Sequence, residues 1–378
     1  MTTYLLAGGG TAGHVNPMLA IAQRLRRDDP KCTILMLGTK EGLESQLVPK
    51  AGFELLTISK VPFPRRPNRD ALSFVSRWRK AVREVRDVIV QRRVDVVVGV
   101  GGYAAAPAYA AAHREGIPFA IHEANARPGL ANRLGARWSR FVGIAISGTS
   151  IRHGTLVGMP LRPEFEQEVT PQQRRDARRS FGLQPDGPTL VVTGGSLGSM
   201  RLNATTSAVA AEFARAGVQI LHITGKGRAS GAISPGVDGI ASAPANDYAE
   251  YRVVEYCDRM RDALACADLV ISRAGASTVC ELAALGVPAV FVPYPVGNGE
   301  QRFNALPLVR AGGAELVKDA DFTPEWMLSR VLPLVRDEAH LVAMAAAARN
   351  LGIRNGAERM CALIDQARAS AVTLRALS

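Results

Sequence analysis

Short apolar segments rich in β-branched residues alternate with longer segments of helical periodicity along most of this chain of 378 residues. The short segments are apolar at nearly every position, which is typical of parallel strands buried on both faces of a sheet. In the first half we expect strands at residues 4–7, 33–37, 55–58, 94–98, 119–122 and 141–146, a helix at 17–27, and helices between most of the later strands.

The alternation loosens over residues 147–163, where a short strand at 156–157 leads into Gly158 and Pro160, and a polar, charged segment follows at 164–179. The pattern then begins again. In the second half we expect strands at 189–193, 219–224, 251–255, 269–272 and 289–293, a helix at 203–216, a surface loop at 225–246, and helix over the last 40 residues.

This pattern predicts an α/β protein with two doubly wound, Rossmann-like sheets that face each other across a cleft. The length fits two domains better than one core. We expect an N-terminal domain of residues 1–161, on which a C-terminal helix at about 355–378 packs, and a C-terminal domain of residues 162–354. Ligands of such sheets bind beyond the carboxyl ends of the strands, so the residues after each strand form the candidate site.

Lys and Arg outnumber Asp and Glu by 46 to 34, and the net charge of +12 indicates anionic partners or a basic surface that only keeps the protein soluble. The five cysteines include no CxxC pair, which favours free thiols in a reducing cytosol over disulfides or a zinc site. The start lacks a basic signal-peptide segment, and Gly and Pro interrupt the uncharged runs at 96–112 and 282–299. We therefore expect a soluble or peripheral protein.

Three glycine-rich turns, at residues 8–14, 99–103 and 194–198, each follow an expected strand and precede an expected helix. Glycine lets the backbone approach a ligand closely, and a helix N-terminus adds partial positive charge, so the turns favour an anionic ligand. The first turn also fits the G-x-G-x-x-G dinucleotide fingerprint formally. That fingerprint needs an acid at the end of the second strand to hold ribose, and the nearest acid, Glu41, is expected to begin a helix instead.

His14 ends the first turn, at the expected start of a helix. An imidazole titrates near neutral pH, so His14 is a candidate general base; the alternative is a helix-capping or packing histidine. The sequence holds no metal-binding constellation. Asp319 and Asp321 form a D-x-D string of the kind that metal-dependent sugar transferases use, but we expect a solvated turn there.

A further anion site is expected after the fourth strand of the second half. Residues 275–277 should begin a helix whose free amides, with the hydroxyls of Ser277 and Thr278, suit a diphosphate. Glu281, one turn further along, is placed either for two sugar hydroxyls or to complement the helix dipole. The polar loop at 297–304 offers amides and a carboxylate to a sugar. Without a metal, a diphosphate leaving group takes its counter-charge from a helix N-terminus and arginines.

Seven motifs occur in order along the chain, from Leu5 to about Ala357. They are Gly9-Gly10-Thr11-Ala12-Gly13-His14, Gly101-Gly102-Tyr103, His122-Glu123-Ala124-Asn125, Gly158-Met159-Pro160-Leu161-Arg162, Gly194-Gly195-Ser196-Leu197-Gly198, Arg273-x-Gly275-Ala276-x-Thr278-x-x-Glu281 and Gln301-x-x-Asn304-Ala305. Each motif alone is weak, whereas the ordered set is highly specific. It resembles the MurG family of bacterial cell-wall glycosyltransferases.

The resemblance implies a GT-B fold and an inverting transfer, without metal or cofactor, of N-acetylglucosamine from UDP to O4 of undecaprenyl-diphosphate-linked muramyl pentapeptide. This reaction converts lipid I to lipid II. The N-terminal domain would meet the acceptor and the membrane, and the C-terminal domain would bind the UDP-sugar. His14 would take the acceptor proton, with Glu123 as a helper. The implied substrate-binding residues are Thr11, Ala12, Gly13, Asn125, Arg162, Ser196, Cys257, Ala276, Ser277, Thr278, Glu281 and Gln301.

Within that set, residues 11–13 would approach the donor sugar and the phosphates, and Asn125 would approach the sugar. Arg162 and Ser196 would hold the nucleotide end, and the backbone at Cys257 would read uracil. Residues 276–281 would bind the diphosphate and ribose, and Gln301 the N-acetylglucosamine.

Three positions depart from the family pattern. Ala12 stands where glycine is common and is tolerated only if its φ is negative. Ala124 replaces a common glutamine. Glu300 replaces the first residue of a common glutamine pair, where it can alter sugar contacts.

The segment between residues 62 and 93 is rich in arginine, and apolar residues recur in it at helical spacing, which is typical of a helix packed on a sheet. Leu72, Phe74 and Trp78, with arginines such as Arg79 around them, also indicate contact with an anionic bilayer, where an acceptor with a polyprenyl tail must be met. We therefore expect a peripheral enzyme on the cytoplasmic face of the cell membrane. Its expected partners are UDP-N-acetylglucosamine, lipid I, the anionic membrane surface and cell-wall synthesis proteins, but no nucleic acid.

Three alternatives remain open. An oxidoreductase would bind a dinucleotide at residues 8–13. A UDP-sugar epimerase on the same fold would convert the donor with no acceptor added. A non-catalytic module for nucleotide sugars or membranes would bind UDP-N-acetylglucosamine without consuming it.

Overall fold

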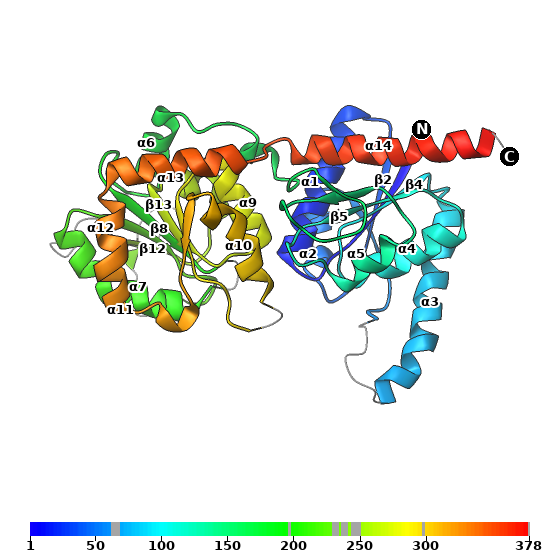
Figure 1. Ribbon diagram of the computed structural model, residues 1–378. Helices are drawn as coiled ribbons and strands as arrows, with labels where there is room; N and C mark the ends of the chain where they lie inside the picture. Colours follow the sequence, from blue (N-terminus) through cyan, green and yellow to red (C-terminus); the bar gives the residue numbers. More distant parts are fainter. Residues whose placement is uncertain are drawn as a thin grey trace. The chain divides into compact units, whose positions relative to one another are not determined.

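The computed structural model describes residues 1–61, 69–195, 198–228, 234–235, 241–242, 251–296 and 299–376. The chain divides into two compact units (Figure 1). Unit 1 contains Met1–Pro163 and Ile353–Ser378, and unit 2 contains Glu164–Gly352. Each unit is built on a largely parallel sheet with helices packed against it, so the expected α/β class is confirmed.

Unit 1 has a seven-stranded sheet in the order β3-β2-β1-β4-β5-β6-β7, with every neighbouring pair parallel. Its strands are β1 (Thr3–Ala7), β2 (Thr33–Gly38), β3 (Glu54–Thr57), β4 (Val96–Gly99), β5 (Phe119–Glu123), β6 (Val142–Ile144) and β7 (Gly154–Leu156). Its helices are α1 (Ala12–Asp28), α2 (Glu44–Lys50), α3 (Arg69–Gln91), α4 (Ala105–Arg114), α5 (Leu130–Gly135) and α14 (Gly356–Ala376).

The strands of unit 1 are apolar throughout because both faces of the sheet are covered. Leu5 and Leu35 point into a core that includes residues of α3 and α4. Their neighbours Leu6 and Met36 point into a second core with residues of α1 and α14. Helix α14 contacts α1, and its Ile364 is fully buried in this second core, so the end of the chain belongs to the first unit.

Unit 2 has an eight-stranded sheet in the order β10-β11-β12-β9-β8-β13-β14-β15. The pairs β10–β11 and β11–β12 are antiparallel, and the others are parallel. The strands are β8 (Thr189–Thr193), β9 (Gln219–Ile223), β10 (Ser234–Pro235), β11 (Ala241–Ser242), β12 (Tyr251–Val254), β13 (Leu269–Ser272), β14 (Ala289–Phe291) and β15 (Ala314–Leu316). The helices are α6 (Pro171–Ser180), α7 (Met200–Arg215), α8 (Met260–Ala265), α9 (Ala276–Leu285), α10 (Glu300–Arg310), α11 (Pro324–Trp326), α12 (Leu332–Val335) and α13 (Glu338–Leu351).

Several elements differ from expectation. Helix α1 begins at Ala12, five residues before the expected start at 17, because Pro17 lies within the helix rather than at its first position. Helix α2 begins at Glu44, not at Glu41. The short strand β15 was not expected, and the last 40 residues form α13 and α14 with a break at 352–355.

The segment 225–246 was expected to be a loop, but β10 and β11 lie in it. Residues 229–233, 236–240 and 243–250 lie outside the described part of the chain. Within the described part, no helix has the length and apolar character needed to cross a membrane.

Candidate functional site

The first glycine turn carries the chain from β1 into α1. The Gly8 N–H donates to the Leu37 carbonyl on the neighbouring strand at 3.0 Å. Gly10 has a φ of +93°, a conformation that favours glycine, and Thr11 then precedes the first helical residue, Ala12. Among the described non-glycine residues only Arg93 and His153 have positive φ, so Ala12 does not strain the turn.

The first turn touches the second turn, residues 99–103, which follows β4. A Cβ on Gly102 would lie 2.5 Å from the Gly9 carbonyl oxygen, so only glycine fits there. A Cβ on Gly101 would lie 3.1 Å from Nε2 of His14. The His14 imidazole therefore lies against the second turn, at the carboxyl edge of the adjacent strands β1 and β4.

A buried carboxylate lies beneath the first turn. Glu44 is fully buried, and its Oε2 accepts the Gly10 N–H at 2.7 Å. Its Oε1 accepts the N–H and the hydroxyl of Thr39 at 2.8 and 2.9 Å. This acid follows β2, the place where a dinucleotide-binding protein keeps its ribose acid, but its oxygens are bound to the protein itself. The structure therefore gives no support to a dinucleotide site at this turn.

Glu123 ends β5 and is 2% exposed. Its carboxylate accepts the N–H groups of Asn125 and Gly129, each at 2.9 Å, and the side-chain amide of Asn132 at 2.9 Å. Asn132 in turn accepts the Tyr109 hydroxyl at 2.7 Å. These contacts hold the loop that carries Asn125 at the edge of the sheet.

His122 is fully buried next to Glu123, and its Nε2 lies 3.0 Å from the Gly158 carbonyl. Burial, with a smaller contribution from the nearby His14, lowers the pKa of His122 to about 4, against the raising effect of the hydrogen bond to the Gly158 carbonyl. The ring is therefore neutral at pH 7, and because a carbonyl only accepts, Nε2 carries the proton. This bond ties β5 to the segment that leads to Arg162.

In unit 2, helix α9 begins at Ala276 directly after β13. Its N-cap is Gly275, and no side chain caps the first turn, so backbone N–H groups are left for a ligand. The Ser277 hydroxyl is buried and has no hydrogen-bond partner among the described residues. Thr278 and Glu281 lie on the same helix. The uncapped amides and the unpaired Ser277 hydroxyl suit a diphosphate.

Arg273 fastens the loops around this helix start. Its Nη1 donates to the Val292 carbonyl at 2.9 Å, and its Nη2 donates to the Ser199 hydroxyl at 2.7 Å. Asp319 Oδ1 lies 2.6 Å from Nη1, and Oδ2 accepts from Arg201 Nε at 2.9 Å. The interpretation of the D-x-D string as a solvated turn was wrong for Asp319, whose side chain is only 13% exposed because it pairs with two arginines.

Gln301 lies on the first turn of α10. Its Oε1 accepts the N–H of Ala274 at 3.2 Å and that of Tyr294 at 2.9 Å, which connects the loops after β13 and β14. Glu300 begins the same helix, and Cys257 follows β12.

The structure thus gathers the predicted residues in two groups. Those of unit 1 are Thr11, Ala12, Gly13, His14, Glu123, Asn125 and Arg162. Those of unit 2 are Cys257, Ala276, Ser277, Thr278, Glu281 and Gln301. Ser196 lies outside the described residues, as does the side chain of Leu72. Their roles stay predictions.

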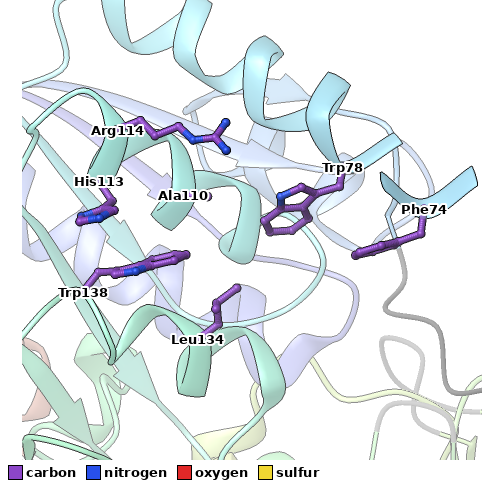
Figure 2. A pocket seen from close by; sticks show the side chains of 7 residues that line it. All are labelled: Phe74, Trp78, Ala110, His113, Arg114, Leu134 and Trp138. Atoms are coloured by element: carbon purple, nitrogen blue, oxygen red, sulfur yellow. The ribbon is translucent and has the colours of Figure 1, made fainter. Parts of the chain in front are cut away.

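An apolar pocket of about 330 Å³ lies between α3, α4 and α5 of unit 1 (Figure 2). Phe74 and Trp78 of α3 stack with ring centroids 6.0 Å apart, and His113 and Trp138 stack at 5.1 Å. Arg114 completes the rim, while Arg79 is exposed on α3. Sequence reasoning missed Trp138, which is far from α3 in the chain.

Comparisons with known proteins agree with this arrangement. Residues 4–144 match the Glycosyltransferase family 28 N-terminal domain, and residues 189–360 match the Glycosyltransferase family 28 C-terminal domain. A relative from Leifsonia xyli subsp. xyli is 54% identical over 96% of this chain and 98% of its own length. One from Clavibacter michiganensis subsp. michiganensis is 55% identical over 97% of each chain. Both are named UDP-N-acetylglucosamine--N-acetylmuramyl-(pentapeptide) pyrophosphoryl-undecaprenol N-acetylglucosamine transferase.

The chain belongs to the MurG family of glycosyltransferases. The crystal structure of MurG from Acinetobacter baumannii aligns with 97% of this chain and 100% of its own, with a TM-score of 0.76 and 27% identity. The MurG-family resemblance and the GT-B fold expected from the sequence are both confirmed. As a member of this family, the protein is a glycosyltransferase, which decides against the oxidoreductase and the non-catalytic module.

Proposed function

We propose that the protein transfers N-acetylglucosamine from UDP-N-acetylglucosamine to the muramyl O4 of undecaprenyl-diphosphate-linked N-acetylmuramyl pentapeptide, converting lipid I to lipid II in peptidoglycan synthesis. The observation that carries this proposal is the identity of 54% and 55%, over nearly the whole chain, to relatives named for this transfer. The reaction belongs to cell-wall growth, and so to cell shape and division.

On this proposal unit 2 binds the donor. The N-terminus of α9 and the hydroxyls of Ser277 and Thr278 hold the diphosphate and stabilise the charge that develops on it as UDP departs. Glu281 binds ribose hydroxyls, the backbone at Cys257 reads uracil, and Nε2 of Gln301 donates to the sugar. Arg162 and Ser196 hold the nucleotide end.

His14 is the proposed general base. It takes the proton of the acceptor O4 as the C1–O bond to UDP breaks and the sugar C1 gains oxocarbenium character. Attack from the face opposite UDP inverts the configuration at C1 and gives a β-linkage. The contact of the His14 ring with the second turn, residues 99–103, supports this role, because that contact restricts where the imidazole lies.

Residues of the first turn and of the loop after β5 position the sugar. Thr11, Ala12 and Gly13 approach it with backbone at the start of α1, and Asn125 contacts it from the loop that Glu123 holds. The burial and three hydrogen bonds of Glu123 favour positioning of Asn125 over direct proton transfer.

The protein further acts at the cytoplasmic face of the cell membrane as a peripheral enzyme. The aromatic pocket at Phe74, Trp78 and Trp138, with Arg114 at its rim and Arg79 exposed nearby, supports this. Aromatic rings enter the interfacial region of a bilayer, and arginines bind anionic headgroups. Cell-wall synthesis proteins are the proposed class of protein partner.

The test is incubation of the purified protein with UDP-N-acetylglucosamine and a lipid I analogue, with the product analysed by NMR. The proposal predicts release of UDP and one new β-linkage at O4. Incubation without acceptor distinguishes the proposed transferase from an epimerase, since an epimerase converts the donor with no acceptor present. Conversion of the donor to another UDP-sugar, with no disaccharide formed, would contradict the proposal.

A further inference from the structure

Glu44 is the one described carboxylate that binds the backbone of the first glycine turn. It belongs to none of the seven motifs that carry the family resemblance. Glu44 is the first residue of α2, and its side chain contacts the first turn from there. Its side chain is fully buried, so it does not reach a substrate.

The surroundings of Glu44 are built around its carboxylate. A Cβ on Gly9, Gly38 or Gly42 would overlap atoms of the Glu44 side chain. Both the first turn and the connection from β2 to α2 therefore have glycine where they contact this side chain. Thr39 supplies two further donors and is itself 3% exposed. A buried carboxylate without donors is costly, and here three hydrogen bonds compensate for the burial.

The ionised carboxylate of Glu44 fits its hydrogen-bond partners better than the protonated acid does. Burial raises the pKa of Glu44, but the N–H groups of Gly10 and Thr39 and the Thr39 hydroxyl outweigh burial and bring the pKa below its ordinary value. Every partner is a donor, so a carboxylate accepts all of them. A side-chain amide of the same shape would turn one N–H group toward another.

We propose that Glu44 is a positioning residue for the transfer reaction: its carboxylate fixes the Gly10 peptide and so places Thr11 and the start of the helix that carries His14. Gly10 lies four residues before His14 and has a φ of +93°, a conformation that glycine leaves readily. The hydrogen bond of 2.7 Å is what holds this peptide in one orientation. This inference rests on the proposed function, because it gives Glu44 a part in that reaction.

The same contact narrows what the first turn binds. The Gly10 N–H is occupied, and a negative charge lies directly beneath it. A diphosphate would therefore gain neither that N–H nor a positive field at Gly10. Hydroxyl groups of a sugar carry no charge and are the ligand class that fits this part of the turn.

The test compares Glu44→Gln with Thr39→Val. Glu44→Gln keeps the shape but removes the charge that holds Gly10, whereas Thr39→Val removes one hydroxyl contact to the same carboxylate and leaves the Gly10 bond intact. We expect Glu44→Gln to lower kcat about 10- to 100-fold, because a small misplacement of catalytic groups has effects of that size. Thr39→Val is expected to lower the melting temperature while kcat stays near the wild-type value. UDP binding, which is proposed to depend mainly on residues of unit 2, is expected to remain in both variants.

A second readout does not depend on activity. Amide hydrogen exchange is followed at residues 8–14 of the wild-type protein and of both variants. The Gly10 amide is expected to be protected in the wild type and in Thr39→Val, and to exchange faster in Glu44→Gln. Wild-type exchange at Gly10 as fast as at Thr11 and Ala12 would overturn the proposal, even if Glu44→Gln failed to fold. Equal kcat in the two variants would also overturn it.

If the wild type transfers no sugar but shows the protected Gly10 amide, the proposed function fails while the structural contact stands.

Discussion

Arg273 and Asp319 form an ion pair in which Nη1 and Oδ1 lie 2.6 Å apart. Arg273 lies in the loop after β13, and Asp319 begins the 3-10 turn η2 (Asp319–Asp321) after β15. The Arg273 side chain also binds the loop after β14 and the N-cap of α7. Asp319 thereby helps to hold the start of α9, where the diphosphate is proposed to bind. It also neutralises Arg273, so the α9 N-terminus has to supply most of the counter-charge.

Asp319→Asn is expected to destabilise the protein by about 3 kcal/mol, because it leaves the largely buried Arg273 without its anion. The pair with Arg201, whose side chain is 46% exposed, contributes little. It is also expected to raise KM for UDP-N-acetylglucosamine more than it lowers kcat. Urea unfolding and steady-state kinetics measure the two effects. Asp321→Asn is the matched control, since Asp321 is exposed in the same turn. Equal behaviour of the two variants would show that the Asp319 pair does not hold the donor site.

His14→Ala is expected to lower kcat about 100- to 10,000-fold, the usual range for loss of a general base. UDP binding is expected to change little, because the nucleotide is bound mainly by residues of unit 2. The exposed His340 on α13 provides the control, and His340→Ala is expected to behave as the wild type. Near-normal turnover of His14→Ala would remove His14 from the reaction.

Stability is expected to fall as the pH drops below about 6.5, because burial lowers the pKa of both His122 and His222 to about 4. Their folded pKa lies below the unfolded value of 6.5, so in this window the unfolded chain binds protons that the folded chain does not. Between pH 6.5 and about pH 4, each ring would lower the free energy of unfolding by about 3 kcal/mol. Above pH 6.5 both states are neutral at these rings and the contribution is complete.

Urea midpoints measured between pH 7 and pH 5 test this expectation. His222 lies between Asn203 Oδ1, 3.2 Å from its Nε2, and the Tyr251 hydroxyl, 2.9 Å from its Nδ1. His222→Gln offers a donor and an acceptor but no titration, and it should reduce the slope, whereas His340→Gln should not. A flat profile for the wild type would contradict the assignment of two buried neutral rings.

The double variant Phe74→Ser with Trp78→Ser is expected to lose binding to vesicles that contain anionic lipid, while kcat with a short-chain soluble acceptor stays close to normal. Co-sedimentation with anionic and with zwitterionic vesicles measures this. Val90→Ser is the control, because Val90 is exposed on the same helix but lies outside the pocket. Undiminished binding of the double variant would exclude this face as the membrane contact.

The strands and most helices were predictable because their signal is local. The apolar, β-branched run at residues 189–193 predicts a buried strand from its own residues, and β8 has the predicted bounds. The expected start of α1 was wrong because proline is common at the first position of a helix, whereas Pro17 lies inside α1, whose N-cap is Thr11. Short strands such as β15 carry too few residues for a periodicity.

The sequence points to the motif residues of the candidate site, but it does not show which residues distant in the chain contact one another. Glu44 has no sequence signal of its own, and the D-x-D string that contains Asp319 does not reveal its role. Their partners Gly10 and Arg273 are distant in the chain. Glu41 drew attention as the nearest acid, yet the chain runs on to Glu44 before the helix begins. Only the fold brings such pairs together.

The most direct test of the central claim is transfer of label from radioactive UDP-N-acetylglucosamine to two lipid I analogues, one intact and one lacking the muramyl O4 hydroxyl. The proposed transfer predicts label in the lipid fraction with the intact acceptor, none with the acceptor that lacks O4, and a strongly reduced rate for His14→Ala. Label that stays in UDP-sugars or appears as free sugar with the intact acceptor, or that enters the acceptor without O4, would contradict it.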